Sequence, residues 1–169
     1  MSSEEARVRN ISHIHMNCHD FKVSVAFYEL LGFKVDRIIG NDPDNPSDLN
    51  DMDTVPLNRT EMGASYTVGM GLGTDPRTIT RLEFIQTVEP SPKVKVKIPP
   101  NDRLGMVRIA FTVAGLDEIM ARVKEAGVEI DSIEHFDISP TLSARYCHLY
   151  DPDGNWLTLM EWIKHKKPE

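Results

Sequence analysis

The stretch ISHIHMNCHDFKVSVAFYELLGF, residues 11–33, carries a strand pattern followed directly by a helix pattern. Polar and apolar residues alternate at its start, so one strand face would carry Ser12, Ile14, Met16 and Cys18, and the other His13, His15, Asn17 and His19. Asp20 suits the start of a helix, because its carboxylate can accept hydrogen bonds from the first-turn N–H groups. Gly32 suits the helix end, and residues 33–39 read as a second strand.

The helix after Asp20 is predicted from apolar residues at helical spacing. Its expected buried face consists of Val23, Ala26, Phe27, Leu30 and Leu31. Two further segments, residues 64–73 and 80–88, read as a pair of strands joined as a hairpin.

The same order of elements returns in GMVRIAFTVAGLDEIMARVKEAGVEI, residues 105–130. Phe21–Val35 matches Leu116–Ile130 at a constant offset of 95 positions, with a strand expected at the end of each segment. The preceding strands match at an offset of 93, which aligns His13 with Met106. Residues 143–150 and 156–162 read as the last two strands, joined by the turn DPDGN. The chain is therefore predicted to contain two βαβββ units.

The domain organisation that follows is α+β. We expect an N-terminal tail at 1–10, a first module at 11–95 with an inserted loop at 40–62, a linker at 96–104, a second module at 105–163 and a tail at 164–169. The inserted loop and the linker are assigned from their Asp, Asn and Pro content, which is typical of segments outside helices and strands.

Composition argues against several classes of partner. The 169 residues have a net charge of −7, and no stripe of Lys and Arg is present to neutralise the phosphates of a nucleic acid. No apolar run approaches the ~20 residues that a membrane helix needs, and the first ten residues lack the apolar core of a secretory signal. Cys18 and Cys147 form no CxxC pair. These features predict a cytoplasmic protein with reduced thiols.

The segments HIHMNCHDFKVSVAFYELLGF and LYDPDGNWLTLMEW resemble the vicinal oxygen chelate superfamily, which includes glyoxalase I, methylmalonyl-CoA epimerase, extradiol dioxygenases and bleomycin-binding proteins. The resemblance covers nearly the whole chain apart from the loop at 40–62 and the tails. It implies a glyoxalase-like fold, in which the two modules form a half-open mixed sheet around a cleft. It also implies a small-molecule ligand and a homodimer.

In that family four positions usually hold a divalent metal ion such as Zn, Ni, Fe, Mn or Co. Carried onto this chain, the positions fall on His13, Glu83, Met106 and Thr158. A thioether is a soft ligand suited to copper, and a threonine hydroxyl is a poor ligand for the ions named above. The resemblance therefore implies an incomplete metal site made of His13 and Glu83, with no other cofactor.

Strand alternation extends the candidate site beyond these positions, because residues two apart share a face. His15 should share a face with His13, and Arg108 with Met106. Comparison with glyoxalase-like chains implies that Tyr146 and His148 also face the cleft. The expected catalytic residues are Glu83, His15 and His13, and the expected substrate-binding residues are Arg108, Tyr146 and His148.

Glu83 stands in the middle of an apolar strand, where an unpaired carboxylate would cost several kcal/mol. It must therefore pair with a metal ion, with His13 or His15, or with Arg108. The first functional hypothesis is an isomerase, epimerase or lyase, which stabilises an enolate-like oxyanion of a small, anionic carbonyl compound. The alternative is a non-catalytic drug- or metabolite-binding protein of the bleomycin-resistance type.

Overall fold

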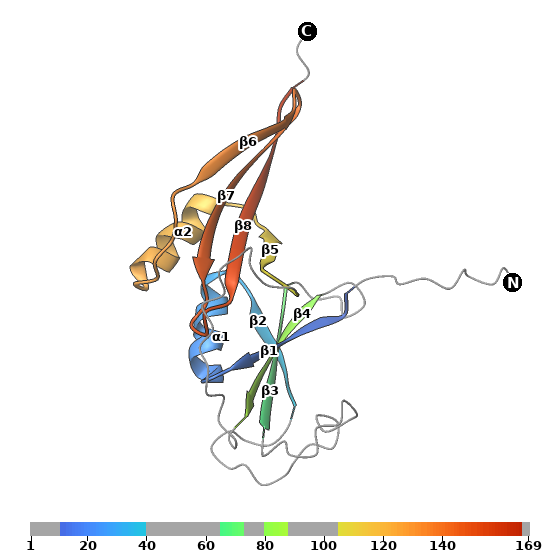
Figure 1. Cartoon of the computed structure of the whole chain (residues 1–169), viewed down its shortest axis with the longest axis vertical. Coiled ribbons are helices and arrows are strands. Elements are labelled where there is room, and N and C mark those ends of the chain that lie inside the picture. The colour runs from blue at the N-terminus through green and yellow to red at the C-terminus, as the bar shows by residue number, and fades with distance from the viewer. Residues whose placement is uncertain (1–10, 40–64, 73–79, 88–104, 167–169) are drawn as a thin grey trace, which may run out of the picture. The chain divides into compact units, whose positions relative to one another are not determined.

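The computed structural model describes residues 11–39, 65–72, 80–87 and 105–166 (Figure 1). The predicted N-terminal tail at 1–10, the inserted loop at 40–62 and the linker at 96–104 lie outside the described residues. Two compact units are formed by contacting residues. The first unit contains the described residues of the ranges 1–25 and 32–92. The second unit contains the described residues of the ranges 26–31 and 93–169.

The first unit contains a four-stranded sheet in the order β1-β4-β3-β2. Its strands are β1 His13–Cys18, β2 Lys34–Ile39, β3 Ser65–Gly71 and β4 Arg81–Thr87. The helix α1 Phe21–Leu30 follows β1 in the chain, and its residues 26–30 belong to the second unit. β1 runs parallel to β4, whereas β3 is antiparallel to both β4 and β2. The predicted hairpin pair of strands is therefore present as β3 and β4.

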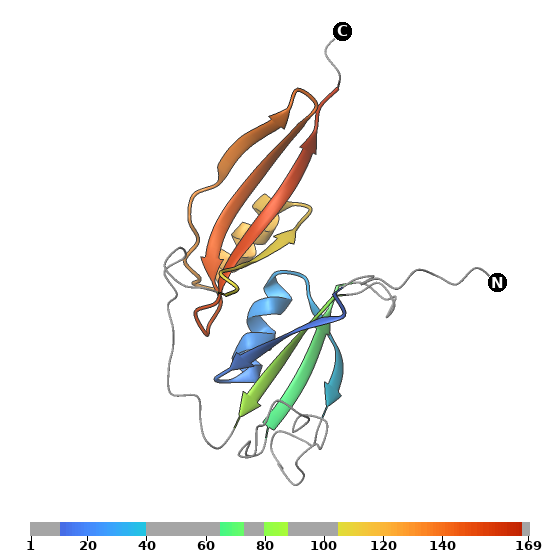
Figure 2. The same ribbon diagram turned by 45° about the vertical axis from the view of Figure 1, so that its right-hand side comes forward.

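The second unit repeats this topology in a sheet of order β5-β8-β7-β6. Its elements are β5 Ile109–Thr112, α2 Leu116–Glu125, β6 Glu134–Ser139, β7 Leu142–Tyr150 and β8 Trp156–Lys164. β5 is parallel to β8, and the other neighbours are antiparallel. Figure 2 shows α2 against one face of this sheet. The predicted α+β class with two βαβββ modules is confirmed.

The alternation predicted for β1 is confirmed. Met16 and Cys18 are buried, whereas His13, His15 and Asn17 are exposed on the opposite face. The predicted helix start is also confirmed, because the Lys22 N–H donates a hydrogen bond of 2.9 Å to Asp20 Oδ1. β1 thus buries its apolar side chains and leaves its histidines accessible.

The predicted buried face of α1 is partly wrong. Phe27 and Leu31 are buried as expected, but Val23 and Ala26 are exposed. The buried positions Ser24 and Tyr28 take their place, and both are polar residues with internal hydrogen-bond partners. Apolar periodicity missed them because a hydroxyl group can be buried when a nearby oxygen accepts its hydrogen bond.

The second module departs from the predicted repeat after Gly127. The strand expected near Ile130 is only an isolated bridge to Leu149, and the second strand of this module, β6, begins at Glu134. All six residues of β6 are exposed, so this edge strand shows no alternation of buried and exposed positions. The strand predicted over 105–113 is also shorter, because β5 begins at Ile109.

No helix among the described residues is long and apolar enough to cross a membrane. Both cysteines are buried and neither forms a disulfide. Burial raises the pKa of the Cys147 thiol to about 11, so this side chain is a neutral part of the core at physiological pH.

Candidate functional site

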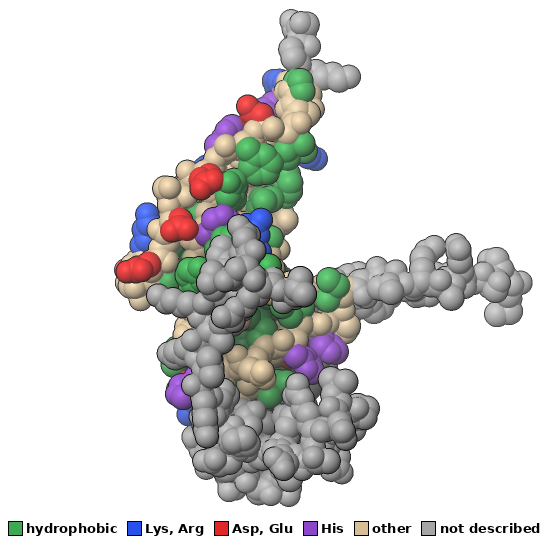
Figure 3. All heavy atoms as spheres, in the orientation of Figure 1, with side chains coloured by type: hydrophobic (Ala, Val, Ile, Leu, Met, Phe, Trp, Pro, Cys, Tyr) green, Lys and Arg blue, Asp and Glu red, His purple; other side chains and the backbone are tan. Residues whose placement is uncertain are grey.

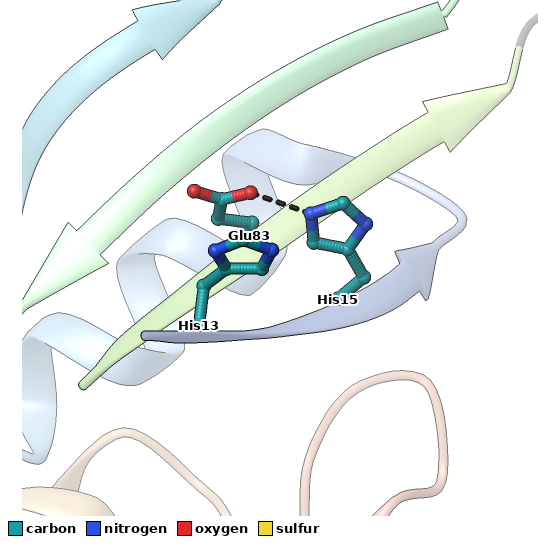
Figure 4. Close-up of side chains that lie close together, drawn as sticks. All are labelled: His13, His15 and Glu83. Carbon is teal, nitrogen blue, oxygen red and sulfur yellow. Dashed lines mark hydrogen bonds and ion pairs between the residues drawn. The ribbon is translucent and has the colours of Figure 1, made fainter. Parts of the chain in front are cut away.

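The first unit brings three of the predicted catalytic side chains together. β1 and β4 pair in parallel with His15 directly beside Glu83, so both side chains project from the same face of the sheet. His15 Nε2 and Glu83 Oε2 are 2.6 Å apart, which is a hydrogen bond and, when the imidazole is protonated, an ion pair. Figure 4 shows His13 and His15 on β1 beside Glu83 on β4. The pairing of Glu83 with His15 was one of the partners expected from the sequence.

Burial differs sharply between the two members of this pair. The side chain of Glu83 is 4% exposed and that of His15 is 47% exposed. An ionised carboxylate can only accept hydrogen bonds, so Glu83 fixes the proton of His15 on Nε2. The second ring nitrogen, Nδ1, is then an acceptor on an exposed ring. This arrangement leaves His15, rather than Glu83, accessible to a small molecule.

His13 completes the group and stacks on His15. The two ring centroids are 4.6 Å apart and the rings are inclined by only 22°. Stacked rings restrict each other's rotation, which holds the His15 imidazole in the orientation set by Glu83. The sequence alternation predicted that His13 and His15 share this face of β1.

The chemistry of this donor set fits a divalent metal ion. One ligand atom from each of His13, His15 and Glu83 lies within 4.8 Å of the other two. Two nitrogen or oxygen ligands of one zinc ion are at most about 4.2 Å apart, so small side-chain rotations would bring the three donors into range. Two imidazoles and one carboxylate also make up a known catalytic ligand set. With His15 included, the ligand set has three members rather than the two implied by the family positions.

We therefore expect the protein, freed of any histidine tag, to bind one Co²⁺ per chain. His13→Ala should weaken the affinity for Co²⁺ at least about tenfold. Loss of a residue that only orients a metal ligand already has an effect of this size, and loss of a ligand itself should cost no less. The visible absorption of Co²⁺ reports the binding directly. His135→Ala is the matched control, since His135 lies on β6 in the other unit. Equal affinity of the His13→Ala variant and the wild type would exclude His13 as a ligand.

In the second unit, the sheet register corrects one predicted equivalence. Thr158 pairs with Ala110 as Glu83 pairs with His15. If Thr158 is the counterpart of Glu83, the residue that corresponds to His13 is Arg108, two positions before Ala110. Met106 does not occupy that position, and 66% of its surface is exposed. In this equivalence a guanidinium group stands at the position where the resemblance implies a metal ligand.

Thr158, the other substituted ligand position, is committed to a neighbouring side chain. Its Oγ1 lies 2.9 Å from His148 Nδ1, and Thr158 itself is buried. This hydrogen bond fixes the ring of His148 on the same face as Tyr146, whose ring centroid is 5.3 Å away. The predicted substrate-binding residues Tyr146 and His148 thus lie together.

Two members of this second cluster were missed from the sequence. The guanidinium carbon of Arg108 lies 5.0 Å from the centroid of the Trp156 ring, which is a cation–π contact. Trp156 is two positions before Thr158, so strand alternation could have placed it on this face. Glu134 was also missed, and its carboxylate accepts a hydrogen bond from the Tyr146 hydroxyl. That bond raises the pKa of Tyr146, and the charge of Arg108 opposes the shift.

The structure thus groups the predicted site residues into two sets. His13, His15 and Glu83 form one set in the first unit. Arg108, Tyr146 and His148 form the other in the second unit, together with Trp156 and Thr158.

Comparison with known families agrees with this geometry. A family model described as Glyoxalase/Bleomycin resistance protein/Dioxygenase superfamily matches residues 10–159. The chain belongs to this superfamily. None of the curated proteins matches it. Since the superfamily contains enzymes and binding proteins, membership establishes the fold and leaves the reaction to the site residues.

Solved structures of the superfamily share the fold at low sequence identity. A glyoxalase family protein from Bacillus cereus aligns over 96% of this chain and 97% of its own, with a TM-score of 0.64 and 19% identity. A glyoxalase I variant from Zea mays has a TM-score of 0.59 and 16% identity over 89% of this chain and 44% of its own. An antibiotic-binding protein from Streptomyces sp. CB03234 has a TM-score of 0.53 and 16% identity over 93% and 98%. Enzymes and binding proteins are both similar to this chain.

Proposed function

We propose that the protein is an isomerase, epimerase or lyase that moves a proton beside the carbonyl group of a small anionic metabolite. The observation that carries this proposal is the 2.6 Å contact between the exposed His15 and the buried Glu83. A carboxylate behind an imidazole orients the ring and stabilises the imidazolium that forms when the ring accepts a proton. A surface histidine with only a structural role has no need of such a partner.

In this proposal His15 Nδ1 accepts the proton from the carbon next to the carbonyl, and the same nitrogen returns it to the product. Glu83 keeps the opposite nitrogen protonated throughout and balances the charge of the imidazolium. His13 restrains the ring through the stacking contact. A divalent ion held by His13, His15 and Glu83 would take the place of this acid–base role and would supply a Lewis acid that polarises the substrate carbonyl.

The substrate-binding role in this proposal belongs to the second unit. Arg108 offers a guanidinium for a carboxylate or phosphate, and Tyr146 and His148 offer polar ring atoms beside it. A homodimer and a cytoplasmic location remain predictions that complete the proposal.

The test is proton exchange with solvent. Small 2-oxo acids, 2-hydroxy aldehydes and acyl thioesters are incubated in D₂O with the protein, and loss of the proton beside the carbonyl is followed by NMR. We expect His15→Ala to slow the exchange of an active compound by at least about 100-fold, because general bases contribute factors of this order. His135→Ala is again the control.

The same assay in EDTA separates two uses of the three side chains. We expect exchange to continue, because the pair formed by His15 and Glu83 needs no ion to accept a proton. Exchange that occurs only after an ion is added would assign His13, His15 and Glu83 to metal binding. The proposal would be overturned if none of the compounds that bind to the protein exchanged the proton beside its carbonyl group.

A binding protein without catalysis is the second candidate. It is favoured by the aromatic side chains on the sheet of the second unit and by the similarity to an antibiotic-binding protein. For such a protein, changes at Glu83 should alter affinity alone.

A further inference from the structure

A continuous row of side chains begins at the residue before β5 and crosses β8, β7 and β6 of the second sheet. From the β5 side to β6 it consists of Arg108, Trp156, His148, Tyr146 and Phe136. The Arg108 guanidinium is 5.0 Å from the Trp156 ring, and the ring centroids that follow are 4.9, 5.3 and 5.6 Å apart. The row therefore has one positive end and an aromatic body.

The row lies on the face of the sheet opposite α2. The face under α2 carries fully buried residues such as Leu157, Leu159 and Cys147. On the opposite face Phe136 is 38% exposed and Trp162 is 43% exposed. Figure 3 shows hydrophobic side chains gathered over this part of the second unit. Exposed aromatic groups concentrated on one face are typical of a binding surface.

The positive end of the row is arranged to bind an anion. Within the part of the chain that the structure describes, no carboxylate forms an ion pair with Arg108. The Arg108 guanidinium carbon lies over the Trp156 ring, and the positive charge is carried by a group rich in N–H donors. Those N–H groups match the two oxygens of a carboxylate.

The aromatic body is held in place before any ligand arrives. Thr158 binds Nδ1 of His148, and Glu134 binds the Tyr146 hydroxyl. Both rings are therefore fixed by hydrogen bonds at their polar atoms, and their apolar surfaces remain for stacking. Fixed side chains lose little conformational entropy on binding, which favours affinity.

We propose that this face binds a small molecule in which a flat aromatic or conjugated ring carries a carboxylate. The ring stacks on the aromatic row while the carboxylate pairs with Arg108. As a statement about the substrate, the inference rests on the proposed function, and it narrows the anionic carbonyl compound to one with a planar ring system. As a statement about binding, it stands on the second unit alone.

The experiment uses three probes in isothermal titration calorimetry with the full chain. 2-Naphthoate has both features, 2-naphthylmethanol lacks the charge, and cyclohexanecarboxylate lacks the aromatic ring. We expect 2-naphthoate to bind at least ten times more tightly than either relative. Arg108→Gln should remove its advantage over 2-naphthylmethanol, and Trp156→Leu should weaken both aromatic probes. Lys124→Gln removes a positive charge from α2 on the other face and should change nothing.

Three results would overturn the inference. They are equal affinity for the three probes, full 2-naphthoate affinity in Arg108→Gln, and a dimer in sedimentation analysis that Trp156→Leu dissociates. The last result would assign the face to a second copy of the chain. Titration of Glu83→Gln separates this inference from the proposed function. If 2-naphthoate binds but neither the wild type nor a variant exchanges a proton, only the proposed reaction is rejected. If proton exchange occurs without binding of 2-naphthoate, only the proposed ligand class is rejected.

Discussion

Replacing Glu83 with glutamine is expected to slow proton exchange by about 1,000-fold, and His15→Ala, which removes the base through which Glu83 acts, should slow it by at least as much. Glutamine has nearly the same volume, so the packing of a side chain that is 4% exposed is preserved. The negative charge that stabilises the His15 imidazolium is lost, and neutralising the carboxylate of a comparable catalytic pair lowers the rate by about 10⁴-fold. The measurement is the D₂O exchange rate of the active compound.

Further readouts show whether Glu83 acts through His15 or only supports the fold. The affinity for the bound compound and the melting temperature should change little. Absence of exchange in the wild type, together with an altered affinity in Glu83→Gln, would support the binding-protein candidate.

The group of His13, His15 and Glu83 could be predicted from the sequence because it depends on local periodicity. Strand alternation puts the two histidines on one face, and a carboxylate within an apolar strand requires a partner. The stacking and the 2.6 Å distance could not be predicted, because they depend on the register between β1 and β4. Those two strands are far apart in sequence, and nothing in either one states which residues pair.

The unknown register between strands also explains why Met106 was predicted to be the counterpart of His13. An offset between two segments can be shifted by two positions without changing which residues share a face, so alternation allowed both Met106 and Arg108. The pairing of Ala110 with Thr158 removes the ambiguity. β6 was misplaced for another reason, because a fully exposed edge strand lacks the buried positions that produce a period of two.

The corrected register shows that the two halves use equivalent positions for different chemistry. In the first unit, His15 and Glu83 stand side by side as a base and its carboxylate. In the second, the corresponding residues are Ala110 and Thr158, which neither carry charge nor accept a proton at neutral pH. Arg108 replaces His13 in the same comparison. In the proposed function, the repeated fold thus supplies a reactive set of side chains once and a recognition set once.

Replacing Asp151 with alanine is expected to lower the free energy of unfolding by about 3 kcal/mol, because several buried donors lose their acceptor at once. Asp151 Oδ1 accepts hydrogen bonds from the N–H groups of Asp153 and Asn155, at 3.0 and 2.7 Å. Oδ2 accepts from the Asn155 side chain at 2.8 Å and from the Tyr28 hydroxyl at 3.0 Å. The carboxylate thereby joins α1 to the turn between β7 and β8.

Tyr28→Phe is the matched comparison, because it removes only the hydroxyl that reaches Asp151. Tyr28 is fully buried, and the ring volume is retained. We expect a loss of about 1 kcal/mol, since the other three donors to Asp151 remain. Urea unfolding followed by tryptophan fluorescence measures both variants. Equal losses for the two variants would mean that the turn does not depend on Asp151.

The pH dependence of the Asp151 effect has a definite sign. Burial raises the pKa of this carboxyl group, and the hydrogen bonds from Asn155 and Tyr28 only partly oppose the shift. A raised pKa in the folded state means that folding favours the protonated form, so this contribution to stability is complete below the unfolded pKa and declines as the pH rises through the folded value. Alanine does not titrate, so the variant lacks this pH-dependent contribution to stability. The difference in unfolding free energy between wild type and Asp151→Ala should therefore be larger at about pH 4 than at about pH 7. A difference that grows toward neutral pH would show that the hydrogen bonds outweigh burial in setting the pKa of this carboxyl group.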